Sequence, residues 1–307
     1  MQYYNRMSYF IVFSLSILLN YLIRNYFLKK RFIDEINHRS SHKTVATRSG
    51  GTVLFLIIFF YCVYLYVNGV QPFDFSILIP VSILFVTGLY DDIYKVDFGL
   101  KFIFQIIVAK YLIDLGYIID VFSFFGFEYS FSRQISQIIT IFIFVAIINA
   151  YNFIDGIDSN IHLETIKNLI LILFFFQPNQ TYFNLIVFTI IVVFITLIFN
   201  LKKKGKVFMG DSGSLIIPLL LIVFVFQSTY FGDQNTTKYL FIIFLYPLID
   251  LVRVVLIRIY SHKSPFLPDR NHFHHIINKK INSHFKSSLI IMSLAIIFQL
   301  GLMLVLF

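Results

Sequence analysis

The sequence has no tryptophan, a single cysteine and few charged side chains. Cys62 has no partner in the chain, so an intrachain disulfide is excluded, and its apolar neighbours indicate a packing role. Charged residues make up 13% of the 307 residues, about half the share of an ordinary soluble domain. This scarcity excludes a soluble protein of the usual kind. Without tryptophan, the 19 tyrosines must supply most of any aromatic belt.

Apolar runs recur from end to end, and the mean hydropathy is +0.80. At the roughly 20 residues that a bilayer requires, they predict about ten transmembrane helices in an all-α polytopic membrane protein with a single domain over 1–307. The first run reaches spanning length without a small-residue cleavage site, which predicts a retained helix and not a signal peptide. The expected spans are 7–28, 51–70, 76–92, 100–118, 134–151, 161–177, 182–200, 213–231, 238–259 and 287–306.

Basic residues predict the orientation. Of the 25 lysines and arginines, 19 fall in the loops on one side of the expected bundle, and only Arg6, Arg133 and Lys238 fall on the other. Basic loops face the cytoplasm, so both termini are expected outside, in the periplasm. The net charge of +9 is then explained by loops near anionic lipid and does not require nucleic acid. Every polar cluster below falls on the basic side.

The first cluster, "LYDDIYKVD" (89–97), places Asp91 and Asp92 directly after an apolar run. An aspartate at a helix centre costs about 2.5–3.5 kcal/mol on insertion scales, so the pair should lie at a helix end or face a wet cavity. An ordinary loop start after the third span explains them equally well. The alternative is a metal–phosphate site, because Mg²⁺ prefers hard oxygen ligands.

The second cluster is "NAYNFIDGIDSN" (149–160), in which four Asn or Asp side chains recur every three residues. On a helix this spacing places them on one slowly drifting face, a pattern that a simple capping turn before the sixth span does not explain. Gly156 would allow a ligand to approach the backbone. The four residues are Asn149, Asn152, Asp155 and Asp158.

The third cluster is "KKKGKVFMGDSGSL" (202–215). Its lysines fit the basic side of the membrane, and Asp211 opens a helix whose N–H groups attract anions. The "GDSG" string is similar to a serine-protease nucleophile motif, but it leads straight into a membrane span. It is also no P-loop, since no Gly-Lys-Ser/Thr follows.

Two further clusters and one pair complete the polar face. "SPFLPDRNHFHH" (264–275) crowds histidines beside Arg270, a set that suits a pyrophosphate better than the tetrahedral zinc sites, although a plain solvated loop is the simpler alternative. "NHRSSHKTVATRSGG" (37–51) is a basic loop that could close over a polyanion. Asp250 and Arg253 are spaced to pair along a helix and are expected to be structural.

In this order the motifs resemble the polyprenyl-phosphate N-acetylhexosamine-1-phosphate transferases, glycosyltransferase family 4, in particular the branch that initiates enterobacterial common antigen and O-antigen. The resemblance covers nearly the whole chain. It rests on Arg48, Gly50 and Gly51 (Arg-x-Gly-Gly), the Asp-Asp pair, Lys101 and Gln105 (Lys-x-x-x-Gln), the Asn-x-x-Asp-Gly-x-Asp motif, "FMGDSGS", and the Arg-x-His-x-His-His loop.

The resemblance implies transfer of a sugar-1-phosphate from a UDP-N-acetylhexosamine to undecaprenyl phosphate, with release of UMP, as the first membrane step of a surface polysaccharide. It implies Mg²⁺, with Mn²⁺ as a substitute, a bacterial inner-membrane location, membrane lipid around the chain and compatibility with a homodimer. The implied catalytic residues are Asp91, Asp92, Asp155 and His274. The implied metal ligands are Asp211 and Asp92. The implied substrate-binding residues are Arg48, Lys101, Asn152, Asp158, Phe208, Arg270, His272 and His275.

Two positions depart from the family pattern: Ser159 stands where glycine is frequent, and Ala46 where proline is frequent. Neither removes a charge. The peptidoglycan branch, which transfers phospho-MurNAc-pentapeptide, carries three consecutive histidines and is disfavoured by "NHFHH". A transporter or lipid flippase is the rival from another class, and it predicts polar residues and broken helices near the bilayer midplane.

Overall fold

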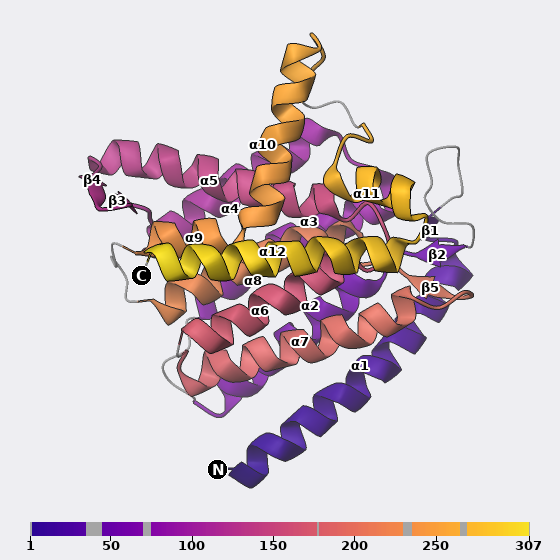
Figure 1. The fold of residues 1–307 in the computed structure, drawn as a ribbon. Coiled ribbons are helices and arrows are strands. Elements are labelled where there is room, and N and C mark those ends of the chain that lie inside the picture. Colours follow the sequence, from indigo (N-terminus) through magenta and orange to yellow (C-terminus); the bar gives the residue numbers. More distant parts are fainter. Residues whose placement is uncertain are drawn as a thin grey trace.

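The computed structural model describes residues 2–34, 45–69, 75–176, 178–229, 235–264 and 269–306. Helices dominate it, and five short strands accompany them (Figure 1). The helices are α1 (Gln2–Lys30), α2 (Gly50–Val67), α3 (Leu78–Tyr94), α4 (Phe98–Asp114), α5 (Arg133–Ile154), α6 (Asn160–Phe175), α7 (Gln180–Asn200), α8 (Gly210–Ser228), α9 (Thr236–Ile243), α10 (Leu245–Tyr260), α11 (Phe273–Ile281) and α12 (His284–Leu306), with a short 3-10 turn, η1 (Phe75–Ile77).

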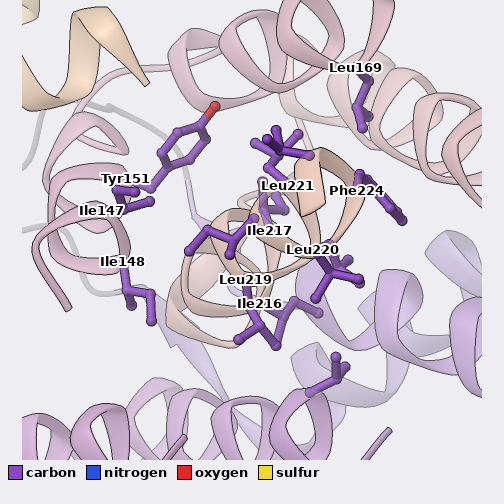
Figure 2. Close-up of a cluster of buried hydrophobic side chains, with 14 of the residues drawn as sticks. Ile147, Ile148, Tyr151, Leu169, Ile216, Ile217, Leu219, Leu220, Leu221 and Phe224 are labelled. Atoms are coloured by element: carbon purple, nitrogen blue, oxygen red, sulfur yellow. The ribbon is translucent and has the colours of Figure 1, made fainter. Parts of the chain in front are cut away.

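Helix α8 forms the centre of the bundle. It is apolar all round, as expected of a helix surrounded by others, and nearly every side chain from Ser212 to Phe226 is buried. Figure 2 shows Ile147, Ile148 and Tyr151 of α5 and Leu169 of α6 arranged around its isoleucine and leucine side chains. The middle of α8 is therefore enclosed by other helices.

Fewer helices qualify as membrane spans than the sequence predicts. Among the described residues, seven helices are long and apolar enough to cross a bilayer, or eight when α9 and α10 are taken as one bent span. Helices α4 and α6 occupy two of the ten predicted spans but have only 17 and 16 residues. At 1.5 Å per residue each is about 25 Å long, shorter than the roughly 30 Å hydrocarbon core. The multipass class is confirmed, and the tally of ten is not.

The expected uninterrupted span 238–259 is also wrong. The chain bends by 74° between α9 and α10. In Figure 1 α10 runs across the direction of α12 and projects from the bundle. The proline at position 247 lies in the first turn after the break, so a helix continuing from α9 would lack the N–H that its hydrogen-bond ladder uses there.

In the described ranges, two small sheets cap opposite ends of the bundle (Figure 1). One joins β1 (Ile33–Asp34), β2 (Ala46–Thr47) and β5 (Lys206–Val207), in the order β1-β2-β5. The other is the hairpin β3 (Val121–Phe124) and β4 (Phe127–Ser130). Both chain ends lie away from the three-stranded sheet, which shares its end of the bundle with α11.

Candidate active site

The paired aspartates meet the start of α8. Gly88 allows α3 to approach the backbone of α8 closely, because a Cβ at this position would lie only 2.5 Å from the backbone of Asp211. One helical turn later, the Asp92 carboxylate accepts hydrogen bonds from the N–H groups of Asp211 (2.8 Å) and Ser212 (2.9 Å). The predicted anion site at this helix start is thus filled by the protein's own carboxylate.

Lys101 joins three helices at the same place. Its Nζ lies 2.6 Å from the Asp91 carboxylate of α3 and 2.5 Å from that of Asp211 in α8. Asp91 also accepts the N–H of Val96 at 2.6 Å, which fixes the carboxylate after the end of α3. Two carboxylates from distant parts of the chain therefore converge on a single cation.

The same carboxylates suit a divalent metal. No three His, Cys, Asp or Glu side chains in the described ranges already form a metal-holding group. Asp155, however, is close enough to Asp211 and Asp92 that burial, followed by these two negative neighbours, raises its pKa well above the ordinary value. A cluster that disfavours its own ionised form is one that a hard cation would stabilise.

The Asn and Asp side chains of the second cluster (149–160) do not lie on one helical face. Helix α5 ends at Ile154, so Asp155 and Asp158 lie in the following turn, and the predicted register beyond it is wrong. Asn152 donates to Ser214 of α8 at 2.8 Å. The asparagines of α5 and the aspartates of the turn consequently reach different neighbours.

Asp158 is held by two side chains, from β5 and α12. It pairs with Lys206 of β5 and accepts or shares a hydrogen bond with His284 of α12 at 3.0 Å. Burial raises the pKa of Asp158, but the hydrogen bonds from His284 and Lys206 outweigh it, and the net shift is downward. This carboxylate remains ionised and ties β5 to α12.

Arg48 and Phe208 come together through the three-stranded sheet. Arg48 binds Asp34 of β1 at 2.6 Å and lies 3.9 Å from Asp92. The main chain of Phe208 is fixed on both sides, by the carbonyl of Thr47 and by the N–H of Gly50. Its ring is partly exposed, as a stacking surface requires.

Helix α10 holds residues 269–275, here called the histidine segment. Asp250 accepts from the N–H of Phe273 (3.0 Å) and lies 2.9 Å from Nδ1 of His272. It also pairs with Arg253 at 2.8 Å, which confirms the predicted pair. Arg258 binds Asp269 at 2.7 Å.

The remaining histidines of this segment are neutral at pH 7. Burial, aided by His272 and Arg270, lowers the pKa of His275 to about 4. His274 is fully buried, and burial, aided by His275, lowers its pKa well below the usual value. Neither ring nitrogen of His274 has a hydrogen-bond partner among the residues that the structure describes. Arg270, which is exposed, is the permanent cation of the segment.

Several positions in the site were not singled out from the sequence as functional. Lys206 was hidden in a lysine run, while Asp34 and His284 carry no motif of their own. Asp250 was expected only to pair with Arg253, but its second oxygen orients His272. The basic residues Arg39, His42 and Lys43 of the 37–51 loop lie outside the described residues.

The two departures from the family pattern have visible consequences. Ser159 adopts φ = 69°, a left-handed conformation that glycine adopts without strain. Its N–H is held by Asn200 at 2.9 Å. Ala46 forms part of β2, whose backbone pairs with both neighbouring strands.

A sequence profile described as glycosyl transferase family 4 matches residues 74–229, which include the Asp-Asp pair, Lys101, the Asn-x-x-Asp motif and Asp211. The match covers half of the chain. The chain belongs to glycosyl transferase family 4. The expected resemblance is thereby confirmed at the level of the family.

Curated relatives of this family extend the similarity over nearly the full length. Undecaprenyl-phosphate alpha-N-acetylglucosaminyl 1-phosphate transferases from Yersinia pestis and Escherichia coli K12 are each 28% identical to the chain, over 88% and 87% of it and 75% and 74% of their own length. The enzyme of the same name from Thermotoga maritima is 28% identical over 89% of the chain and 81% of its own length.

Proposed function

We propose that this family 4 enzyme transfers N-acetylhexosamine-1-phosphate, with N-acetylglucosamine-1-phosphate as the first candidate, from a UDP-sugar to undecaprenyl phosphate and releases UMP. The observation that carries the proposal is the convergence of Asp91 and Asp211 on one cation, at one end of a bundle of membrane helices. The relatives' names supply the lipid and the sugar. The chain acts as one unit over its length.

Asp211, Asp91 and Asp155 would hold Mg²⁺, because Asp91 and Asp211 converge on Lys101 and the negative charge of Asp211 adds to burial in raising the pKa of Asp155. When bound there, Mg²⁺ would supply positive charge that neutralises the phosphates and favours attack by one phosphate on another. Asp92 has both oxygens on backbone N–H groups, so its main task is to fix the position of Asp211 and its second task is ligation.

The basic and aromatic residues around the carboxylates would each bind a different part of the two substrates. Lys101 would bind a phosphate if Asp91 and Asp211 held the metal, and Phe208 would stack on uracil. Arg48 and Arg270 supply permanent positive charge for the diphosphate. His272, His274 and His275 would contact the same group. His274 and His275 would do so as neutral hydrogen-bonding side chains, since burial disfavours their cations. Asn152 and Asp158 would line the part of the site that binds the nucleotide.

The physiological setting is the bacterial inner membrane, with the site on the cytoplasmic face, where nucleotide sugars are made, and both termini in the periplasm. The basic loops favour this orientation. The product would be the lipid-linked first sugar of a surface polysaccharide.

The decisive experiment incubates the purified protein with undecaprenyl phosphate, Mg²⁺ and a panel of radiolabelled UDP-N-acetylhexosamines, and scores the label in the lipid fraction together with UMP. We expect transfer with at least one sugar and none with EDTA. Asp211→Asn and Asp92→Asn should abolish turnover, because each removes charge or orientation from the carboxylate cluster, and His274→Ala should reduce it.

The matched control is Asp114→Asn, which changes an exposed aspartate that pairs with Lys110 along α4. It should keep wild-type turnover. Absence of transfer with every sugar would favour the transporter alternative, to which the broken α9–α10 pair lends some support. Wild-type activity in both Asp211→Asn and Asp92→Asn would refute the assigned metal site.

A further inference from the structure

The bend between α9 and α10 leaves a carbonyl group without its normal helical donor. In a continuous helix the carbonyl of Ile243 would accept from the N–H of residue 247, four positions later. That residue is Pro247, which has no N–H. Inside a bilayer an unsatisfied backbone group costs several kcal/mol, so another group must supply the donor.

Gln299 of α12 supplies it. Its side-chain amide lies 2.7 Å from the carbonyl oxygen of Ile242 and 3.2 Å from that of Ile243. Gln299 is fully buried in the middle of a long apolar helix. A buried glutamine in such a helix is expensive unless its hydrogens are used, and here they are used at the break.

A buried polar network stands behind Gln299. Its amide also reaches Asn168 of α6 at 3.3 Å, and Asn168 in turn donates to Tyr151 of α5. Glu164 accepts from Asn168 (3.2 Å) and from Lys167 (2.7 Å), and both charged side chains are buried. The carboxylate–ammonium pair thus fixes Asn168, which orients Gln299.

The far side of the bend carries the histidine segment. Asp250, Arg253 and Arg258 of α10 bind His272, the carbonyl of Asn271 and Asp269, respectively. The direction in which α10 leaves the break therefore decides where residues 269–275 lie relative to the carboxylate cluster. A helix of 16 residues is about 24 Å long, so a change of about 20° in the bend would move its end by about 8 Å.

We propose that Gln299 is a positioning residue that replaces the hydrogen-bond donor missing at Pro247, holds the α9–α10 bend, and thereby places the histidine segment at the active site. The proposal rests on the proposed function only for its kinetic consequence, since the geometry of the bend can be measured without turnover.

The test measures the bend directly. In a Cys62→Ala background, spin labels are attached at Tyr260→Cys, at the exposed end of α10, and at Leu304→Cys, on the exposed side of α12, and the distance between them is measured by pulsed electron paramagnetic resonance. Gln299→Met keeps the volume but removes the donor. We expect it to shift or broaden the distance by several Å and to lower kcat/KM for the UDP-sugar roughly ten-fold.

Pro247→Ala sharpens the test. Alone it should change little, because Gln299 still holds the bend. Combined with Gln299→Met it allows a straight helix, since alanine restores the backbone N–H that proline lacks, so the double variant should show a larger shift than the sum of the two single variants. Gln299→Asn is the milder version, with a donor that is one methylene shorter, should the methionine variant fail to fold.

The matched control is Gln227→Met, which removes a glutamine–Tyr117 hydrogen bond in α8 away from the bend. It should leave the label distance unchanged. An unchanged distance in Gln299→Met, and in Gln299→Asn, would overturn the proposal even if the enzyme is active. A changed distance in Gln299→Met, together with a wild-type protein that transfers no sugar, would refute the proposed function and leave the role of Gln299 in the bend standing.

Discussion

Adjacent residues of identical type have different roles in this site. Asp91 faces the Lys101 ammonium, whereas the oxygens of Asp92 accept two backbone N–H groups of α8. The division follows from the helix, since consecutive side chains diverge by about 100° and only one of them can face the α8 start directly. A change at Asp92 should therefore act through the placement of Asp211, and a change at Asp91 through the loss of charge.

Gly156 offers a sharp test at the scale of one methyl group. A Cβ at this position would lie 2.2 Å from Nε2 of His274, which is buried and cannot swing into solvent. We expect Gly156→Ala to displace His274 and to lower kcat/KM by up to about 10²-fold, since displacements of about 1 Å have such effects. Steady-state kinetics with the UDP-sugar varied would measure it.

The control for this change is Gly301→Ala, at a helical glycine of α12 where an added Cβ meets nothing within 4 Å. It should keep full activity. In a His274→Ala background Gly156→Ala should have little further effect, because the displaced side chain is already gone. An equal loss in both backgrounds would show that Gly156 acts by another route.

The residue types of the site could be predicted from the sequence, but their partners could not. Spacing and membrane cost identified Asp91, Asp92 and Asp211 as polar groups at span ends, and the structure brings them together. His284 carries no motif, and its contact with Asp158 joins positions 126 residues apart. Such a contact depends on how α12 packs on the turn after α5, which no local pattern encodes.

At the scale of elements, α10 and α11 together hold the histidine segment in place. A fall in pH should lower the stability of this part of the fold. His275, in the first turn of α11, has a pKa lowered to about 4 by burial and by His272 and Arg270, against about 6.5 in an unfolded chain. Between these values the unfolded chain binds the extra proton, so stability falls as pH falls from about 6.5 to 4.

We therefore expect the thermal unfolding midpoint in detergent to drop across this pH window, and His275→Gln, which cannot be protonated, to reduce the drop. His262→Gln serves as the control, because His262 is exposed and lies outside α11. The same pH dependence in His275→Gln as in the wild type would remove His275 from the explanation.

Helix existence could be predicted from the apolar runs, but helix breaks could not. Each of the ten expected segments contains a helix, yet the segment 238–259 hides a 74° bend. A single proline in a first turn is compatible with a straight helix, and the bend also requires the donor on α12. The turn at 155–159 was missed for a similar reason, since its periodic Asn and Asp residues continue past the end of α5.

Across the whole molecule as the structure describes it, the side chains assigned to metal and substrate binding lie at one end of the bundle. The starts of α4, α6 and α8 and the ends of α3 and α5 meet there, beside the three-stranded sheet and α11 (Figure 1). The opposite end carries the β3–β4 hairpin, with the exposed aromatic residues Phe125, Phe127 and Tyr129. This asymmetry suits an enzyme that draws a soluble donor from one compartment.

The orientation of the molecule can be tested with one reporter at each end. In a Cys62→Ala background, Lys204→Cys lies in the exposed segment before β5, and Phe127→Cys lies in the exposed hairpin. Because basic loops remain in the cytoplasm, a membrane-impermeant maleimide should label Phe127→Cys in bacterial cells with a permeabilised outer membrane, and Lys204→Cys only after the inner membrane is broken. Both variants should retain transfer activity, which shows that the labelled molecules are folded. Labelling of Lys204→Cys in intact spheroplasts, with Phe127→Cys protected, would place the carboxylate cluster on the outer face, where cytoplasmic nucleotide sugars could not reach it.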